Sequence, residues 1–138
     1  MAVGFTVKFF WYSIGTGDFL HSFFSTIAYN LEDGAWGSKY PYIMNELYSG
    51  RLDKDHIEAA IKELDIIVPK LKKFSPDKVV WDIDDLSKRP PWGDNISSDI
   101  TDLSNYFVTS SGEDLISVIR CAFQDGIEYD TDVKIESI

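Results

Sequence analysis

Three aspartates that follow the apolar residues 79–81 have the spacing in this chain that most suggests chemistry. Asp82, Asp84 and Asp85 could offer carboxylate oxygens to a divalent cation or serve as acids and bases in a hydrolase. A calcium loop, however, needs oxygen ligands at alternate positions, a central glycine and a distal glutamate, and the sequence lacks that spacing. The pattern therefore favours a solvated strand end, and we expect no metal, no cofactor and no catalytic residue here.

Two further patterns also have ordinary explanations. His21 and His56 fall in predicted helices without the Cys or carboxylate spacing of a zinc site, so we expect both on helix surfaces. Gly15-Thr16-Gly17 precedes a helix, but it lacks the lysine of a P-loop and the third glycine of a dinucleotide fingerprint. We expect a tight turn there.

The stretch from residue 79 to 108 is better suited to binding than to catalysis. It contains Pro90-Pro91, Trp92 and the turn residues 93–95, which restrict the loop to few conformations. Between Asp77 and Asp102 there are seven acidic and three basic residues. Aromatic anchors beside charge are typical of interface hot spots. We therefore predict partner contacts, first at Trp92, Asp94, Asp99 and Asp102 and next at Asp84 and Asp85.

The same residues have a structural interpretation that stays open at this point. Trp92 could fill the edge of the core, because aromatic side chains bury readily. Asp99 and Asp102 could each cap a local turn. The grouping of acids around one aromatic side chain favours the binding interpretation.

Charge is distributed unevenly along the chain. The formal net charge is −10 over 138 residues, and residues 76–138 carry five basic against fourteen acidic residues. Direct nucleic-acid binding is therefore not expected, because it requires clustered Lys and Arg. An acidic second half favours attraction to a basic protein.

Length and composition predict one domain over residues 1–138 with a real core, since 44% of the residues are hydrophobic. The single cysteine, Cys121, excludes an internal disulfide and suits a reducing cytoplasm. The sequence shows no secretion signal and no apolar run long enough for a membrane helix. We expect a cytoplasmic protein without membrane contact, and the sequence predicts no oligomeric state.

Helical periodicity predicts helices at about 18–32 and 54–73, with a short helical piece at 42–48 and a last helix from about 111 to 124. Thr16 or Asp18 could cap the first helix and Asp53 the second. Pro69 should bend or end the second helix early. Ser111 could cap the last helix, and Gly126 should stop it.

Alternating or β-branched runs predict strands, which we place at 3–11, 79–83, 106–109 and 133–136. In the first strand Val3, Phe5, Val7, Phe9 and Trp11 would share the buried face. The expected fold is a single α+β domain with a small mixed or antiparallel sheet of about four strands and three to four helices.

Three stretches of sequence support a family resemblance: KYPYIMNELYSGRL, VVWDIDDLSKRPPWGDNIS and DLSNYFVTSSGEDL. They resemble a bacterial family of polymorphic-toxin immunity proteins, immunity protein family seventy, and the likeness runs along most of the chain. Its strongest part is Trp81-Asp82, Pro90-Pro91-Trp92-Gly93 and residues 106–109.

The resemblance implies a cytoplasmic, non-enzymatic protein made beside a toxin gene, which binds a cognate toxin domain and blocks it. Toxins in such systems are commonly nucleases with basic clefts, so the partner would be a basic domain. The resemblance brings no catalytic residue and names no binding surface. Two rivals stay open: a small metal-dependent hydrolase using Asp82, Asp84 and Asp85, and an acidic regulatory module with no toxin partner.

Overall fold

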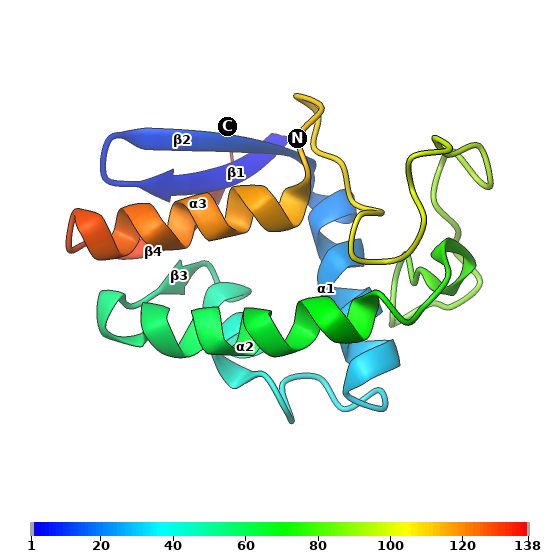
Figure 1. Cartoon of the computed structure of the whole chain (residues 1–138), viewed down its shortest axis with the longest axis horizontal. Helices are drawn as coiled ribbons and strands as arrows, with labels where there is room; N and C mark the ends of the chain where they lie inside the picture. The colour runs from blue at the N-terminus through cyan, green and yellow to red at the C-terminus, as the bar shows by residue number, and fades with distance from the viewer. Residues whose placement is uncertain (1, 138) are drawn as a thin grey trace.

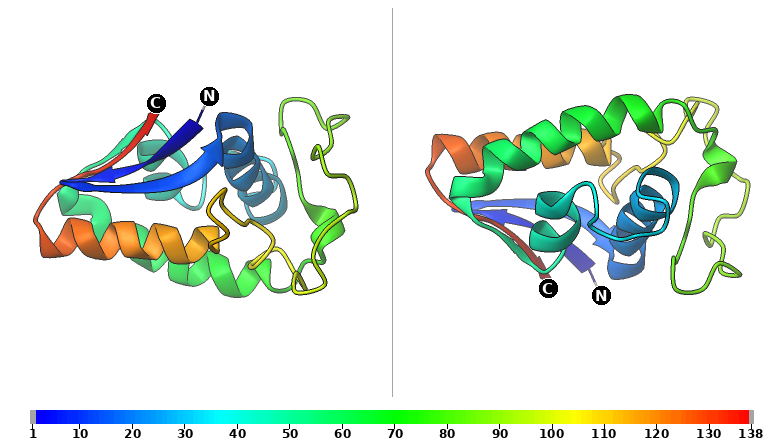
Figure 2. Two further views of the ribbon diagram at one scale, coloured as in Figure 1. Left: turned by 90° about the horizontal axis from the view of Figure 1, so that it is seen from above. Right: turned by 90° about the horizontal axis from the view of Figure 1, so that it is seen from below.

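A four-stranded antiparallel sheet and several helices make up the fold in the computed structural model, which describes residues 2–137 (Figure 1). The strand order is β2-β1-β4-β3, with every neighbouring pair antiparallel. Helix α3 covers one face of the sheet, and α2 packs beside α3. Helix α1 runs across the end of these two helices, and a long irregular segment lies beyond it (Figure 2). The α+β class is confirmed.

The first strand region is a hairpin rather than one strand. β1 (Ala2–Val7) and β2 (Phe10–Thr16) pair through the register Val7 opposite Phe10. The chain turns at Lys8 and Phe9, and Lys8 adopts a positive φ of 55°. The expected single strand at 3–11 is therefore wrong in its second half. Phe5 and Val7 are buried as predicted, whereas Phe9 is 86% exposed at the turn.

Helix α1 (Gly17–Leu31) follows β2 directly and is confirmed. The Thr16 side chain caps it by accepting a hydrogen bond from the Phe19 amide, 3.1 Å away. One face of α1 carries large apolar side chains into the core, among them Phe23, Phe24 and Ile27. The neighbouring face carries buried hydroxyl groups, which form hydrogen bonds with the irregular segment at 79–114.

The middle of the chain consists of one turn of π-helix at Tyr42–Leu47, the two-residue strand β3 (Arg51–Leu52), a 3₁₀ turn at Lys54–His56 and α2 (Ile57–Leu71). Asp53, which was expected to cap the helix itself, caps the 3₁₀ turn before it, because its side chain accepts from the Asp55 amide. Helix α2 continues through Pro69 to Leu71. A proline in the last turn removes one amide bond without preventing the helix from finishing.

The C-terminal part contains α3 (Leu115–Glu128) and β4 (Val133–Ser137). Asp114 caps α3 by accepting from the Ser117 amide, so the expected cap at Ser111 is wrong. Gly126 does not stop the helix. It lies where α3 passes closest to its neighbours, because a Cβ there would stand 2.5 Å from Ile57 Cδ1 and 3.1 Å from the Thr131 carbonyl.

Two predicted strands do not form. After a 3₁₀ turn at Pro76–Lys78, residues 79–114 contain no helix and no strand in the part of the chain that the structure describes. The stretch at 106–109 forms only a bridge between Val108 and Asp114. The number of strands matches the expectation, but β2 and β3 take the places of the predicted strands at 79–83 and 106–109.

Candidate functional site

Helix α1 holds the irregular segment at 79–114 through buried hydroxyl groups. The Ser22 hydroxyl donates to the Val80 carbonyl at 2.8 Å, and Thr26 Oγ1 accepts from the Val80 amide at 3.0 Å. Ser25 Oγ accepts from the Ile83 amide at 3.2 Å. All three hydroxyl side chains are fully buried. In the predicted strand at 79–83, the backbone of Val80 and the Ile83 amide therefore find their partners on a helix instead of on a neighbouring strand.

Trp92 combines the two roles that the sequence left open. Its indole Nε1 donates to the Tyr106 hydroxyl at 2.9 Å, and its ring lies perpendicular to Trp81 with centroids 5.5 Å apart. The residue nevertheless keeps 37% of its surface exposed. Trp92 thus fixes the segment to the core edge with one side and presents the other side to solvent.

A pocket of about 540 Å³ opens on the irregular segment around the turn that contains Trp92. Its lining combines Tyr106 and apolar side chains with two acids and one arginine. Burial raises the pKa of the Tyr106 phenol, so this hydroxyl stays neutral. The lining residues are Pro76, Asp77, Val79, Arg89, Pro90, Gly93, Asp94, Ile96 and Tyr106.

The five predicted acidic contacts lie along this one segment, but no contact gathers them into a single cluster. Asp84, Asp85, Asp94 and Asp99 are exposed, and Asp94 lines the pocket. The fifth acid is Asp102. Within residues 2–137, none of the five carboxylates has a side-chain nitrogen of Lys, Arg or His within 4.0 Å. The charges of the four exposed acids are therefore available to a partner.

Asp102 is the one of the five that is partly buried, and like Asp85, which accepts from the Ser87 amide at 3.1 Å, it holds the local backbone. It accepts from the Ser104 amide at 2.8 Å and from the Thr101 hydroxyl at 3.0 Å. Partial burial would raise the pKa of Asp102, but hydrogen bonds from Ser104 and Thr101 outweigh burial and keep this pKa below its usual range. The turn-capping interpretation thus describes Asp102 correctly, whereas the Asp99 carboxylate lies 3.5 Å from the Ser97 hydroxyl and remains exposed.

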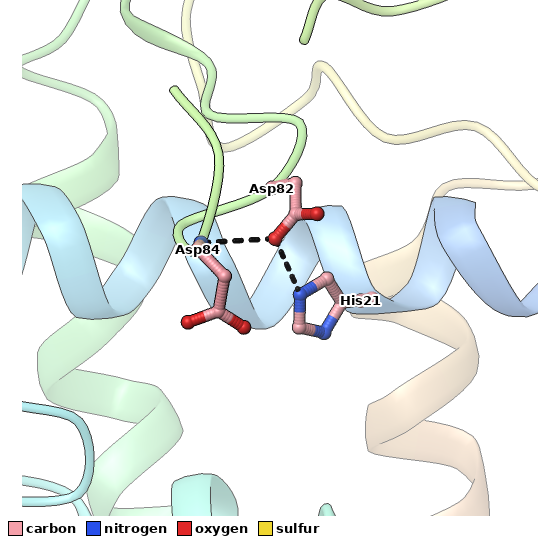
Figure 3. A group of neighbouring side chains, drawn as sticks. All are labelled: His21, Asp82 and Asp84. Carbon is pink, nitrogen blue, oxygen red and sulfur yellow. Dashed lines mark hydrogen bonds and ion pairs between the residues drawn. The ribbon is translucent and has the colours of Figure 1, made fainter. Parts of the chain in front are cut away.

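One group of side chains comes together that the sequence did not predict. His21 on α1 points Nε2 at Asp82 Oδ1, 3.3 Å away, and Asp84 lies beside them (Figure 3). One ligand atom from each of His21, Asp82 and Asp84 lies within 4.8 Å of the others. A hydrogen bond from the Asp84 amide, with help from His21, keeps the pKa of Asp82 below its usual range despite partial burial. His21 is thus more than the plain helix-surface residue that we expected.

A second surface was also missed by the sequence reasoning. At the hairpin turn, Phe9, Phe10 and Trp11 are exposed, and Phe10 packs against Tyr129 with ring centroids 5.4 Å apart. The Lys8 ammonium lies 5.6 Å from the Tyr129 ring. This aromatic tip lies at the end of the molecule opposite the irregular segment (Figures 1 and 2). The sequence does not reveal this surface, because the two-residue turn at Lys8 and Phe9 is not recognisable in it and one continuous strand would bury Phe9 and Trp11.

Comparison with known proteins decides the family. The model of the family described as Immunity protein 70 matches residues 5–135. The chain belongs to this family. Membership confirms the resemblance seen in the sequence and supports a toxin-neutralising immunity function, which implies that the chain binds a cognate toxin and suggests an inhibitor rather than an enzyme. No curated protein and no solved structure matches the chain.

The helices place one further limit on function. Among the described residues, none of the helices combines the length and the apolar character that crossing a bilayer requires.

Proposed function

We propose that the chain is a non-enzymatic immunity protein that acts in the cytoplasm and binds a basic toxin domain, a nuclease, through the acidic surface of residues 84–102. This surface would occupy the cleft in which the toxin holds its phosphate-rich substrate. The observation that carries the proposal is the set of unpaired carboxylates and the half-exposed Trp92 on one segment fixed to α1.

Charge supplies the first part of the recognition. Between residues 77 and 102 the seven acids exceed the three basic residues by four charges. A surface of this sign speeds the encounter with a cationic cleft and opposes binding to acidic proteins. Because the five acids predicted as contacts make no ion pair within residues 2–137, no such pair has to break before the toxin binds them.

Trp92 and the adjacent pocket supply the second part. A long basic side chain of the toxin can lay its aliphatic stem on Pro90 and Ile96 and direct its charged head to Asp94, which lines the same pocket. The exposed side of Trp92 offers a rigid aromatic contact beside it. Desolvated contacts of this kind slow dissociation, whereas the surrounding charges mainly set the association rate.

The proposal is tested by reversing two charges without changing the anchor. Asp94→Lys with Asp99→Lys removes two exposed carboxylates that make no ion pair among residues 2–137. Because close charge pairs across an interface couple by about 1.5 kcal/mol or more each, affinity for the toxin should fall by at least about a hundredfold. Calorimetry with the toxin encoded beside this chain measures the loss, and the thermal midpoint shows that the variant is folded.

A matched control carries the same change in net charge elsewhere. Glu128→Lys with Glu136→Lys reverses two exposed acids on α3 and β4. Under the proposal this control keeps nearly the wild-type affinity and still protects cells that express the toxin. Equal losses of affinity in both double variants would show that only the net charge of the chain matters. An unchanged affinity in the Asp94 and Asp99 variant would contradict the assignment of this surface.

A further inference from the structure

We propose that His21, Asp82 and Asp84 form a binding site for a divalent transition-metal ion, with Zn²⁺ as the preferred ion. The proposal does not depend on the toxin, because it concerns the isolated chain. It rests on a half-buried imidazole and two carboxylates whose ligand atoms lie close together (Figure 3). The histidine stands 61 residues before the first of the two aspartates in the chain.

The spacing of the ligand atoms suits a small ion. In a tetrahedral zinc site with bonds of about 2.0–2.1 Å, neighbouring ligand atoms are about 3.3–3.4 Å apart. His21 Nε2 and Asp82 Oδ1 lie 3.3 Å apart. The Asp84 carboxylate is exposed and lies within 4.8 Å of both, so a change in its side-chain torsions brings an oxygen to the third position.

The imidazole is already oriented for this role. His21 Nδ1 lies 2.7 Å from the Tyr48 hydroxyl, and the ring stacks on Trp36 with centroids 5.8 Å apart and an interplanar angle of 22°. A histidine that binds a metal through one nitrogen almost always bonds a polar group through the other, which fixes the ring and its tautomer. Tyr48 fills that outer position, and Nε2 is left to face the carboxylates.

The carboxylates are also held in place by groups outside the site. The Asp84 amide donates to Asp82 Oδ1 at 2.9 Å, and α1 clamps the preceding backbone at Val80. Lys88 Nζ lies 3.6 Å from Asp82 Oδ2, so its exposed ammonium competes for the other oxygen. Lys88 can swing into solvent when an ion neutralises the two carboxylates.

The donor set selects the kind of ion. One imidazole nitrogen with two carboxylate oxygens matches Zn²⁺, Mn²⁺ or Co²⁺, whereas Ca²⁺ prefers six to eight oxygen ligands. Three protein ligands leave at least one position for water. Because the ion would link α1 to the irregular segment at 79–114, its binding should raise the thermal midpoint and slow amide exchange around Asp84.

The experiment uses the whole chain freed of metal by a chelator. Isothermal titration with Zn²⁺ should show saturable binding of one ion per chain, and differential scanning fluorimetry should show a higher thermal midpoint with Zn²⁺ than with Ca²⁺ or Mg²⁺. Asp84→Asn should weaken Zn²⁺ binding at least about tenfold, because a charged ligand is lost. Asp85→Asn, one residue away and outside the group, should bind as the wild type does.

Two histidine variants complete the test. His21→Gln should abolish the saturable binding, whereas His56→Gln, which alters the other histidine beside Glu46, should leave it intact. If His21→Gln fails to fold, the comparison of Asp84→Asn with Asp85→Asn still tests the site. Absence of saturable Zn²⁺ binding, an equal response to Ca²⁺, or wild-type binding by Asp84→Asn would each overturn the proposal.

Discussion

The hydrogen bonds between Thr26 and Val80 provide the sharpest test of how the irregular segment is positioned. Thr26→Val keeps the shape of the side chain and removes the hydroxyl that accepts from the Val80 amide at 3.0 Å and lies 3.2 Å from the Val80 carbonyl. Ser22 still donates to that carbonyl at 2.8 Å. The variant therefore leaves one buried donor, the Val80 amide, without its partner.

The size of the effect follows from this single unsatisfied group. Leaving a buried amide without an acceptor costs about 1–3 kcal/mol. For a chain of 138 residues, whose unfolding entropy is about 0.3 kcal/mol/K, this loss lowers the thermal midpoint by about 3–10 °C. A valine methyl in place of the hydroxyl regains little of it, because that position faces the amide and the carbonyl of Val80.

Calorimetric unfolding measures the loss, and hydrogen exchange locates it at the Val80 amide. Thr101→Val is the control, because Thr101 is exposed and its hydroxyl bonds only to neighbouring side chains; we expect a change of about 0.5 kcal/mol or less. A Thr26→Val variant as stable as the wild type, with unchanged exchange at Val80, would refute the view that α1 hydroxyls hold the segment.

Two further predictions concern the scaffold. Gly126→Ala should destabilise the fold by about 1–2 kcal/mol in denaturant unfolding, because overpacking against Ile57 costs more than the gain in helix propensity returns. Gly17→Ala is the control and should not destabilise the fold, because the space around an added Cβ is open there. Asp132 has a pKa below its usual range, chiefly because the Lys54 amide donates to it and secondarily because Arg51 pairs with it. Its stabilising contribution is complete above the ordinary aspartate pKa of about 3.9 and is lost as pH falls through the lowered folded-state pKa. The stability gap between wild type and Asp132→Asn should therefore be present at pH 7 and close in acid, and a gap that widens in acid would contradict this assignment.

The helices could be predicted from sequence because their signals are local. In α1 and α2, apolar side chains recur at helical spacing. The cap at Thr16 directly precedes α1, and Asp53 caps the 3₁₀ turn that leads into α2. The end of α3 shows the limit of such signals. Gly126 looks like a stop in the sequence, but its role is to let α3 approach Ile57, which depends on tertiary packing.

The strands were harder because their partners lie far away in sequence. Residues 79–83 have the composition of a strand, yet buried hydroxyls on α1 satisfy their backbone. The hairpin turn at Lys8 and Phe9 lacks the Gly or Asn that usually marks a positive φ, so two strands looked like one. Local composition gave the correct number of strands and missed which residues pair.

The predicted partner contacts at residues 84–102 stay a prediction, and the structure shows that their backbone belongs to one irregular segment. The acids and Trp92 do lie on one segment, because proline and aromatic residues there indicate a restrained loop. The approach of His21 to Asp82 could not be predicted, since no spacing rule joins a helix residue to a loop residue 61 positions later. For Asp102 the structure adds local hydrogen bonds, such as the one from the Ser104 amide, and its predicted contact with a partner stays a prediction.

Hydrogen exchange of the chain, free and bound to its toxin, tests the central claim most directly. Amides between 84 and 102 lie in irregular backbone and should exchange quickly in the free protein, so protection on binding is easy to detect. The account predicts protection at these residues, strongest around Trp92 and Asp94, with the hairpin tip at Phe9 unchanged. Protection confined to the tip, with residues 84–102 exchanging as in the free chain, would contradict it.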